Sequence, residues 1–238
     1  MNIERAAIEA NLQVVHERIA EAALRSGRLP EGVRLVAITK SRPEQAIRDA
    51  YGCGQRDFGE NRVEEAQPKQ AALDDLPGIR WHMVGKIQSR KARDVAGHFE
   101  YVHSVDRMKI ARRLNQYQTR VGEPLHVLLE INTSGEDTKA GWYIPEGIAP
   151  AEFMVDFQQV LSLPHLQVGG LMTMAALGAS AQAVRMTFAR LCEIRDQVEQ
   201  KLNCKLPELS MGMSDDYEIA IEQGATMVRV GRAIFTPR

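Results

Sequence analysis

The sequence predicts an α/β fold: a (β/α)8 TIM barrel that forms a single domain over residues 1–238, with an extra N-terminal helix. Three observations favour this fold. Eight predicted strands alternate with segments of helical periodicity, as strands and helices do in a parallel barrel. The connections between these strands and helices are short, and the sequence contains no linker or internal repeat. The length of 238 residues is ordinary for such a barrel.

The extra helix and the first strand open the chain. Apolar residues recur at helical spacing over residues 3–25, before Gly27, which predicts a helix there. Val33 to Ile38 then form an apolar run long enough for a strand that is buried on both faces. The run ends at Lys40, and Pro43 suits the start of the next helix.

The other strands and helices follow in strict alternation. Seven further strands are predicted, at residues 57–61 (a short strand and turn), 79–84, 101–105, 125–131, 166–172, 208–211 and 227–230. Helices are predicted between or after them at residues 44–51, 63–73, 88–96, 106–121, 151–161, 181–202 and 215–223. An open doubly wound sheet is the alternative, but it usually has a glycine-rich turn after its first strand. Residues 40–43 contain no glycine, so the barrel is favoured.

Composition limits the classes of function. The net charge of −1 gives no basic field for nucleic acid or a membrane surface, and no apolar run is long enough to span a bilayer. Three cysteines without CxxC spacing, and an N-terminus with charged residues in place of a signal peptide, predict a cytoplasmic protein. The six histidines show no metal-ligand spacing, so no metal is expected, and His103 and His126 are interpreted as packing residues.

A barrel brings the carboxyl ends of its strands to one mouth, where ligands bind. The residues expected there include Lys40, Asn61, His82, Met211 and Arg229. A partly desolvated lysine amine at such a strand end is available as a nucleophile. We therefore expect Lys40 to be the reactive residue.

Two loops of the mouth suit a phosphate group. Residues 210–214 follow the seventh strand, and residues 231–233 follow the eighth. The loops after strands seven and eight often hold phosphate in barrels, through backbone N–H groups and hydroxyls. Gly212 and Gly231 allow a close approach of the backbone, and the hydroxyls of Ser210 and Ser214 are phosphate donors, so a phosphorylated carbonyl compound is the predicted ligand.

Several motifs carry a resemblance to a known family over nearly the whole chain. They are LVAITK (35–40), FGENR (58–62), WHMVG (81–85), IQS (87–89), EINTSG (130–135), KAG (139–141), GLMTM (170–174), LSMGMSDD (209–216) and VRVGRAIF (228–235). The chain resembles the pyridoxal phosphate homeostasis proteins, whose fold looks like the barrel domain of alanine racemase.

The resemblance implies a cofactor and roles for residues. The cofactor is pyridoxal 5′-phosphate (PLP), and Lys40 is the lysine that forms a Schiff base with it. Ser210, Gly231 and Arg232 fall where the family binds phosphate, and Arg229 falls where it faces the pyridine nitrogen. Asn61 and Met211 are expected beside the cofactor. Position 232 is Arg where the family often has a small hydroxyl residue; the backbone donors at Gly231 and Arg232 survive this change.

We therefore expect the protein to act in intracellular vitamin B6 homeostasis rather than in catalysis, with PLP-dependent apoenzymes as candidate recipients of the PLP. The main alternative is a PLP-dependent amino-acid racemase-like enzyme. Alanine racemases take an opposing tyrosine from a second domain across a dimer, and no such domain follows the eighth predicted strand. We therefore also expect a monomer. A lysine-dependent aldolase and a nucleic-acid or protein-binding module are weaker alternatives, because aldolases usually use a middle strand and the basic cluster at residues 86–93 lacks interleaved aromatic residues.

Overall fold

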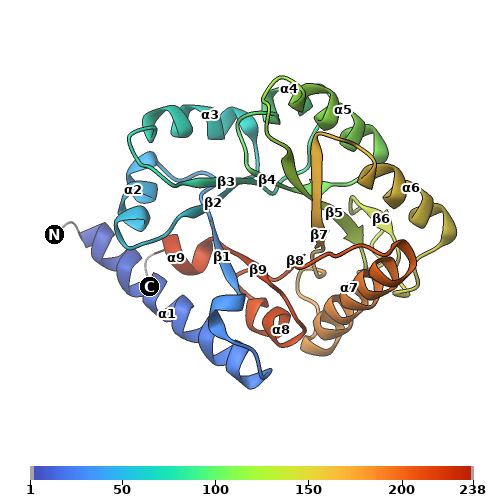
Figure 1. The fold of residues 1–238 in the computed structure, drawn as a ribbon. Helices are drawn as coiled ribbons and strands as arrows, with labels where there is room; N and C mark the ends of the chain where they lie inside the picture. The colour runs from blue at the N-terminus through green and yellow to red at the C-terminus, as the bar shows by residue number, and fades with distance from the viewer. Residues whose placement is uncertain (1–2, 237–238) are drawn as a thin grey trace.

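Eight parallel strands close into a barrel in the computed structural model, which describes residues 3–236 (Figure 1). The strands are β1 (Arg34–Ile38), β2 (Asp57–Glu60), β3 (Arg80–Met83), β4 (Tyr101–Val105), β5 (Leu125–Asn132), β7 (Leu166–Met172), β8 (Glu208–Ser210) and β9 (Met227–Val230). They pair in the order β4, β3, β2, β1, β9, β8, β7, β5, and a β4–β5 pairing completes the circle. The predicted (β/α)8 barrel is confirmed.

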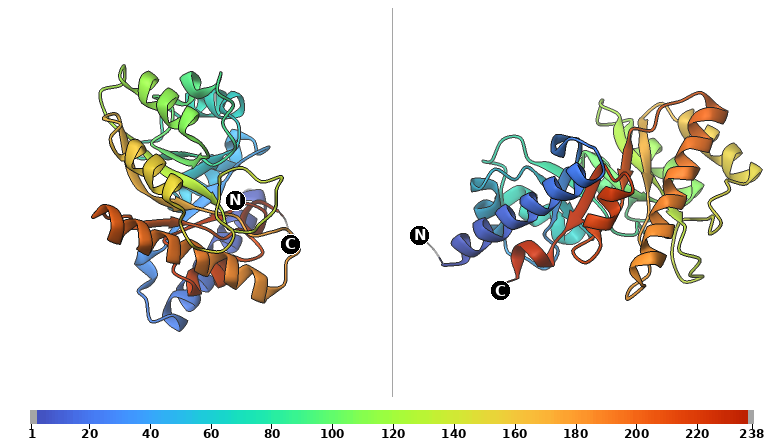
Figure 2. Two further views of the ribbon diagram at one scale, coloured as in Figure 1. Left: turned by 90° about the vertical axis from the view of Figure 1, so that its right-hand side faces the viewer. Right: turned by 90° about the horizontal axis from the view of Figure 1, so that it is seen from below.

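Helices surround the barrel in both figures that show the whole chain (Figures 1 and 2). They are α1 (Ile3–Arg25), η1 (Pro30–Gly32), α2 (Glu44–Gly52), α3 (Val63–Ala72), α4 (Ala92–Val95), α5 (Met108–Gln118), α6 (Ala151–Leu161), α7 (Ala181–Leu202), α8 (Tyr217–Glu222) and α9 (Arg232–Phe235). A short strand, β6 (Trp142–Tyr143), pairs with the end of β5. Each helix lies within or close to a segment that the apolar periodicity predicts, apart from η1 and α9, which were not predicted, and α4 is much shorter than predicted.

The extra N-terminal helix packs against helices from both the beginning and the end of the barrel sequence. α1 packs against α2, α8 and α9, and it lies beside α9 in Figures 1 and 2. The Asn11 side chain donates hydrogen bonds to the carbonyl oxygens of Ile234 (3.0 Å) and Thr236 (3.2 Å). Because Asn11 is buried, these bonds fix α1 to the segment that follows β9.

Burial of the strands on both faces follows from this arrangement. Leu35, Val36 and Ala37 of β1 are all buried, as expected where helices cover the outer face and side chains fill the interior. Leu128 and Met172 pack with Met227 in a small buried cluster, separate from the main hydrophobic core.

The helix predicted at residues 88–96 is wrong in length, because α4 covers only Ala92–Val95. The carbonyl groups before it are satisfied from another element. Arg113 donates to the carbonyl oxygen of Ser89 (3.0 Å), and Arg107 donates to that of Ile87 (3.3 Å). Arginines of α5 and its approach thus replace the hydrogen bonds that a longer helix would have made.

Among the helices of residues 3–236, none is long and apolar enough to cross a membrane. Within the same residues, no group of three or more His, Cys, Asp or Glu side chains could hold a metal ion.

Candidate functional site

Lys40 lies two residues beyond the end of β1, and its side chain is exposed at the mouth of the barrel. It borders two cavities, of about 470 and about 380 Å³. Met213 and Arg229 border both cavities as well, so the two are halves of one site. Among the described residues, no hydrogen bond or ion pair engages the Lys40 amine. The amine is therefore free to react.

The turn after β1 is held by the buried ion pair between Lys69 and Glu60. Lys69 of α3 donates to the carbonyl oxygen of Thr39 (2.8 Å) and to Glu60 (2.6 Å). The Thr39 hydroxyl donates to the same Glu60 oxygen (2.6 Å). Ser41 adopts a left-handed φ of 57°, which is uncommon for a residue other than glycine. The contacts of Lys69 and Glu60 thus fix the backbone before Lys40, and after it the Ser41 backbone N–H donates to Glu65 (3.4 Å).

Arg229 on β9 places a buried cation at the floor of the site. It donates to the hydroxyl of Ser210 (2.5 Å) and to the carbonyl oxygen of Thr173 (2.9 Å). Burial lowers the pKa of Arg229 to about 10, although the charges of Asp216 and Glu130 oppose the shift. The guanidinium group is thus still charged at neutral pH, with N–H groups left for a ligand.

The larger cavity lies between the loops that follow β8 and β9. Ser214 and Gly231 border it, together with the exposed side chain of Arg232. The Ser214 hydroxyl oxygen accepts the backbone N–H of Ala233 at 3.5 Å, which brings the two loops together. Arg232 forms an ion pair with Asp215 across the same gap. A hydroxyl, an accessible backbone and a guanidinium are a suitable set for an anion.

The smaller cavity contains Asn61 and Glu130. Asn61 packs so closely on Gly85 that a Cβ atom at Gly85 would lie 2.2 Å from the Asn61 carbonyl oxygen. Burial, with a smaller effect of Asp106, raises the pKa of Glu130 to about 7. A carboxyl group that titrates near neutral pH can act as an acid or as a base.

The structure brings five of the eight predicted site residues together at the mouth. They are Lys40, Asn61, Arg229, Gly231 and Arg232.

The other three lie below the mouth, and their expected placement is corrected. His82 and Ser210 are fully buried in the barrel interior, where other side chains occupy their polar atoms. Met211 is fully buried in the core, and Met213 borders the cavities in its place. The reason is that β8 continues through Ser210, so the exposed part of the loop begins later than the sequence analysis assumed.

Sequence analysis named the Ser214 hydroxyl as a phosphate donor but, by resemblance, placed the phosphate contact on Ser210, and it missed Glu130 as a residue of the site. Ser214 was part of the predicted loop, and its greater distance from the strand was the signal that could have selected it. Glu130 stands in the otherwise apolar run of β5, and a lone carboxylate in a buried strand is itself a signal of function.

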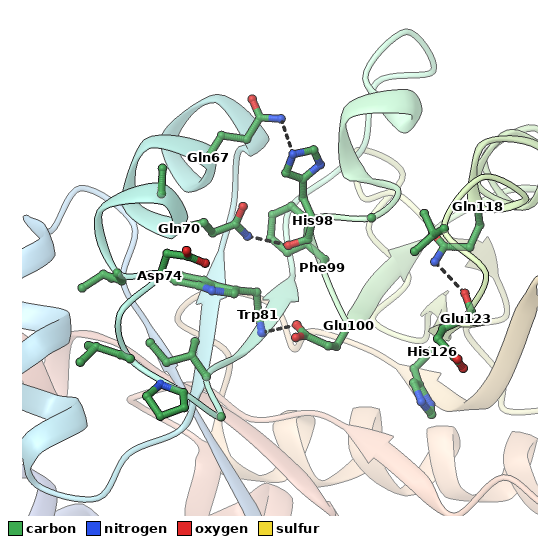
Figure 3. A pocket seen from close by; sticks show the side chains of 18 of the residues that line it. Gln67, Gln70, Asp74, Trp81, His98, Phe99, Glu100, Gln118, Glu123 and His126 are labelled. Atoms are coloured by element: carbon green, nitrogen blue, oxygen red, sulfur yellow. Dashed lines mark hydrogen bonds between the residues drawn. The ribbon is translucent and has the colours of Figure 1, made fainter.

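A larger cavity, of about 840 Å³, opens at the other end of the barrel, before β3, β4 and β5 (Figure 3). Figure 3 shows Glu100 accepting the backbone N–H of Trp81, and Gln118 donating to the carbonyl oxygen of Glu123. No lysine or arginine is among the described residues that line it. It therefore offers neither an amine nucleophile nor a cation for phosphate.

The fold and the site together define a class of protein. The family model for the alanine racemase N-terminal domain matches residues 3–238. Alanine racemase from Clostridium difficile superposes with a TM-score of 0.71 at 14% identity, covering 96% of this chain and 56% of the racemase. This likeness shows the barrel fold. The protein is thus an alanine racemase-like barrel.

Relatives with higher identity narrow the class. A pyridoxal phosphate homeostasis protein from Pseudomonas aeruginosa is 46% identical over 231 residues, which are 97% of this chain and 96% of the relative. One from Escherichia coli is 40% identical and covers 97% of both chains. The structure of PipY from Synechococcus elongatus with PLP bound has a TM-score of 0.81 at 40% identity, covering 93% of this chain and 99% of PipY. The chain belongs to the pyridoxal phosphate homeostasis protein family.

Proposed function

We propose that this protein binds pyridoxal 5′-phosphate as a Schiff base on Lys40 and acts as a carrier in intracellular vitamin B6 homeostasis. The observation that carries the proposal is the Lys40 amine, which none of residues 3–236 engages, at the junction of two cavities that both border Arg229. The names of the relatives and the PLP-bound structure of PipY support the choice of ligand.

The residues of the site fit the three recognisable groups of PLP. The Lys40 amine suits the aldehyde, and the buried donors of Arg229 suit the ring nitrogen. The backbone at Gly231 and the side chain of Arg232 suit the phosphate. We assign the hydroxyl contact to Ser214 instead of Ser210, because Ser214 borders the cavity and Ser210 does not.

The same residues favour holding the cofactor over using it. Bound PLP supplies an electron-withdrawing ring, which is most effective when its nitrogen is protonated. Arg229 has only donor groups and keeps its proton at neutral pH, so it stabilises the unprotonated nitrogen. The ring is then a weak acceptor of electrons, and the chain is better suited to binding than to turnover.

Glu130 keeps a racemase-like enzyme as the second candidate function. Racemisation needs a base on each face of the substrate, and Lys40 provides one. Glu130 borders the same cavity and has a pKa of about 7, so it is the described residue best suited to a second base.

Two measurements separate the candidates. Borohydride reduction of the PLP-loaded protein should leave a pyridoxyl adduct on the peptide that contains Lys40, whereas an adduct on Lys69, Lys86 or Lys139 would contradict the assignment. L-alanine or L-serine incubated with the loaded protein in heavy water should show negligible exchange of its α-proton. Exchange at enzyme-like rates that is lost in Lys40→Ala would favour the racemase.

The remaining expectations concern the surroundings of the protein. We propose the cytoplasm as its compartment, since the three cysteines are free thiols. We also propose that it acts as a monomer and transfers PLP to PLP-dependent apoenzymes. Analytical ultracentrifugation would test the monomeric state, and reactivation of an apoenzyme by the loaded protein would test the transfer of PLP.

A further inference from the structure

A line of hydrogen-bonded side chains crosses the barrel interior and ends at Arg229. Asp57 contacts His82 at 2.9 Å, and His82 contacts His103 at 2.9 Å. His103 contacts the Ser210 hydroxyl at 2.7 Å, and Ser210 accepts from Arg229 at 2.5 Å. We call the first four residues the interior chain. They come from β2, β3, β4 and β8, and all four are buried.

The direction of every hydrogen bond in the interior chain follows from its carboxylate end. Burial raises the pKa of Asp57, but hydrogen bonds from Arg80 and His82 outweigh this effect and lower the pKa to about 2. Asp57 is therefore an acceptor at neutral pH. Burial lowers the pKa values of His82 and His103, so both imidazoles are neutral, with one N–H and one acceptor nitrogen each.

The protons can then be placed one after another. His82 donates through Nε2 to Asp57, so its Nδ1 must accept from Nε2–H of His103. Nδ1 of His103 must then accept the hydroxyl hydrogen of Ser210. The lone pairs of Ser210 Oγ remain for Arg229, which donates to them. The ionised carboxylate of Asp57 thus determines which way the Ser210 hydroxyl hydrogen points, and so leaves the Ser210 oxygen to accept from Arg229.

Packing alone does not account for this arrangement. Polar side chains in a barrel interior lose hydration and must be fully hydrogen-bonded to avoid a cost in stability. Apolar residues fill neighbouring positions, as Leu128 and Met172 do. The interior chain also explains two residues of the sequence motifs, His82 and Ser210, that border neither cavity of the site.

We propose that the interior chain positions Arg229, so that its free N–H groups face the ring nitrogen of the bound cofactor. The inference rests on the proposed function, because it assigns a purpose to that cofactor site. Ser210 and the Thr173 carbonyl oxygen anchor two nitrogens of the guanidinium group and so fix its plane. If His103 instead presented an N–H to Ser210, the Ser210 oxygen would accept from both His103 and Arg229, and its hydroxyl hydrogen would lose the acceptor that orients it, which weakens this anchor.

The test compares two ligands that differ only at the ring nitrogen. They are PLP and its carbocyclic analogue, in which C–H replaces that nitrogen; both have the aldehyde and the phosphate. Dissociation constants are measured by absorption titration. A hydrogen bond from a charged donor should make the wild type prefer PLP by roughly tenfold or more. Ser210→Ala, His103→Gln and Asp57→Asn should lower this preference severalfold, whereas Ser210→Thr, which keeps the hydroxyl, should retain it.

The matched control is His126→Gln. His126 is a partly buried strand histidine stacked on Tyr101, outside the interior chain, so its replacement should leave the preference unchanged. A ratio of two affinities within one variant is insensitive to a general loss of stability, which separates positioning from folding. Should Ser210→Ala fail to fold, Asp57→Asn provides the same comparison.

An unchanged preference in folded Ser210→Ala and Asp57→Asn would overturn the inference. Equal binding of both ligands by the wild type would also overturn it, because Arg229 would then not reach the ring nitrogen, while cofactor binding itself would stand. Binding of neither ligand by the wild type would contradict the proposed function as well.

Discussion

The ammonium group of Lys69 lies 2.8 Å from the carbonyl oxygen of Thr39, the residue that directly precedes Lys40. Lys69 also pairs with Glu60, whose side chain is fully buried. The second carboxylate oxygen of Glu60 has no hydrogen-bond partner within residues 3–236. The backbone next to the reactive lysine is thus held by a buried ion pair in which one carboxylate oxygen has no described hydrogen-bond partner.

Removal of Lys69 should cost stability and disturb Lys40 together. Lys69→Met would leave a buried carboxylate without its partner, which costs roughly 3–5 kcal/mol when a buried pair is broken on one side. Urea unfolding measures this loss. The yield of the borohydride adduct on Lys40 should fall in the same variant, because the Thr39 carbonyl loses its donor.

The control for that variant is Lys91→Met, which removes an exposed ion pair with Glu64. It should change neither the stability nor the adduct appreciably. Equal losses in both variants would show that burial of the Glu60–Lys69 pair is unimportant.

Ser214→Ala should weaken binding of the phosphorylated ligand in particular. A hydrogen bond to a charged group contributes roughly 1.5–3 kcal/mol, so the affinity for PLP should fall about tenfold or more. Affinity for unphosphorylated pyridoxal should be unchanged, as should both affinities in Ser162→Ala, an exposed serine at the end of α6. A similar loss for both ligands would remove Ser214 from the phosphate site.

Asp215→Asn should strengthen binding of PLP. In the wild type, Asp215 pairs with Arg232 at the rim of the cavity of about 470 Å³, and its negative charge repels a phosphate bound there. Both side chains are mostly exposed, so solvent and salt screen the effect, and a gain of about two- to fivefold at low salt is expected. Asp196→Asn, which affects another exposed pair, should show no gain. A loss of affinity would mean that Asp215 instead holds Arg232 in its binding position.

Glu130→Gln should stabilise the protein at pH 8 and leave it unchanged near pH 4. The pKa of Glu130 is raised from 4.5 to about 7, so the folded state binds a proton more tightly than the unfolded state. Stability contributed by the protonated form is therefore full below about pH 4.5 and is lost as the pH rises to 7 and above. Glutamine avoids this loss, which amounts to roughly 3 kcal/mol.

Thermal or urea unfolding at the two pH values checks the prediction, with exposed Glu152→Gln as the control. An identical gain at pH 4 and pH 8 would mean that the substitution acts through packing and not through ionisation.

The barrel was predictable because its strands differ so clearly from their flanks. The β5 and β7 runs have the length and apolar content of buried parallel strands, and each helix pattern stops at a glycine, a proline or a polar residue. The exception at residues 88–91 depends on arginines of a later segment, at Arg107 and Arg113, which local periodicity does not contain.

The site was predictable in part for the same reason. Lys40 follows a strand that ends abruptly, and so its position at the mouth could be inferred. Ser210 and Ser214 could not be separated, since only the register with β7 and β9 shows that Ser210 still belongs to the strand. His103 was interpreted as packing because its partners are distant in sequence.

The pairing of β1 with β9 has a consequence for synthesis of the protein on the ribosome. Lys40 leaves the ribosome early, whereas Arg229, Gly231 and the α9 segment held by Asn11 leave it late. A nascent chain that stops before β9 therefore has the reactive amine but lacks the cation and the second loop. Partly made chains should not retain the ligand, and its capture should mark the moment at which the last strand enters the barrel.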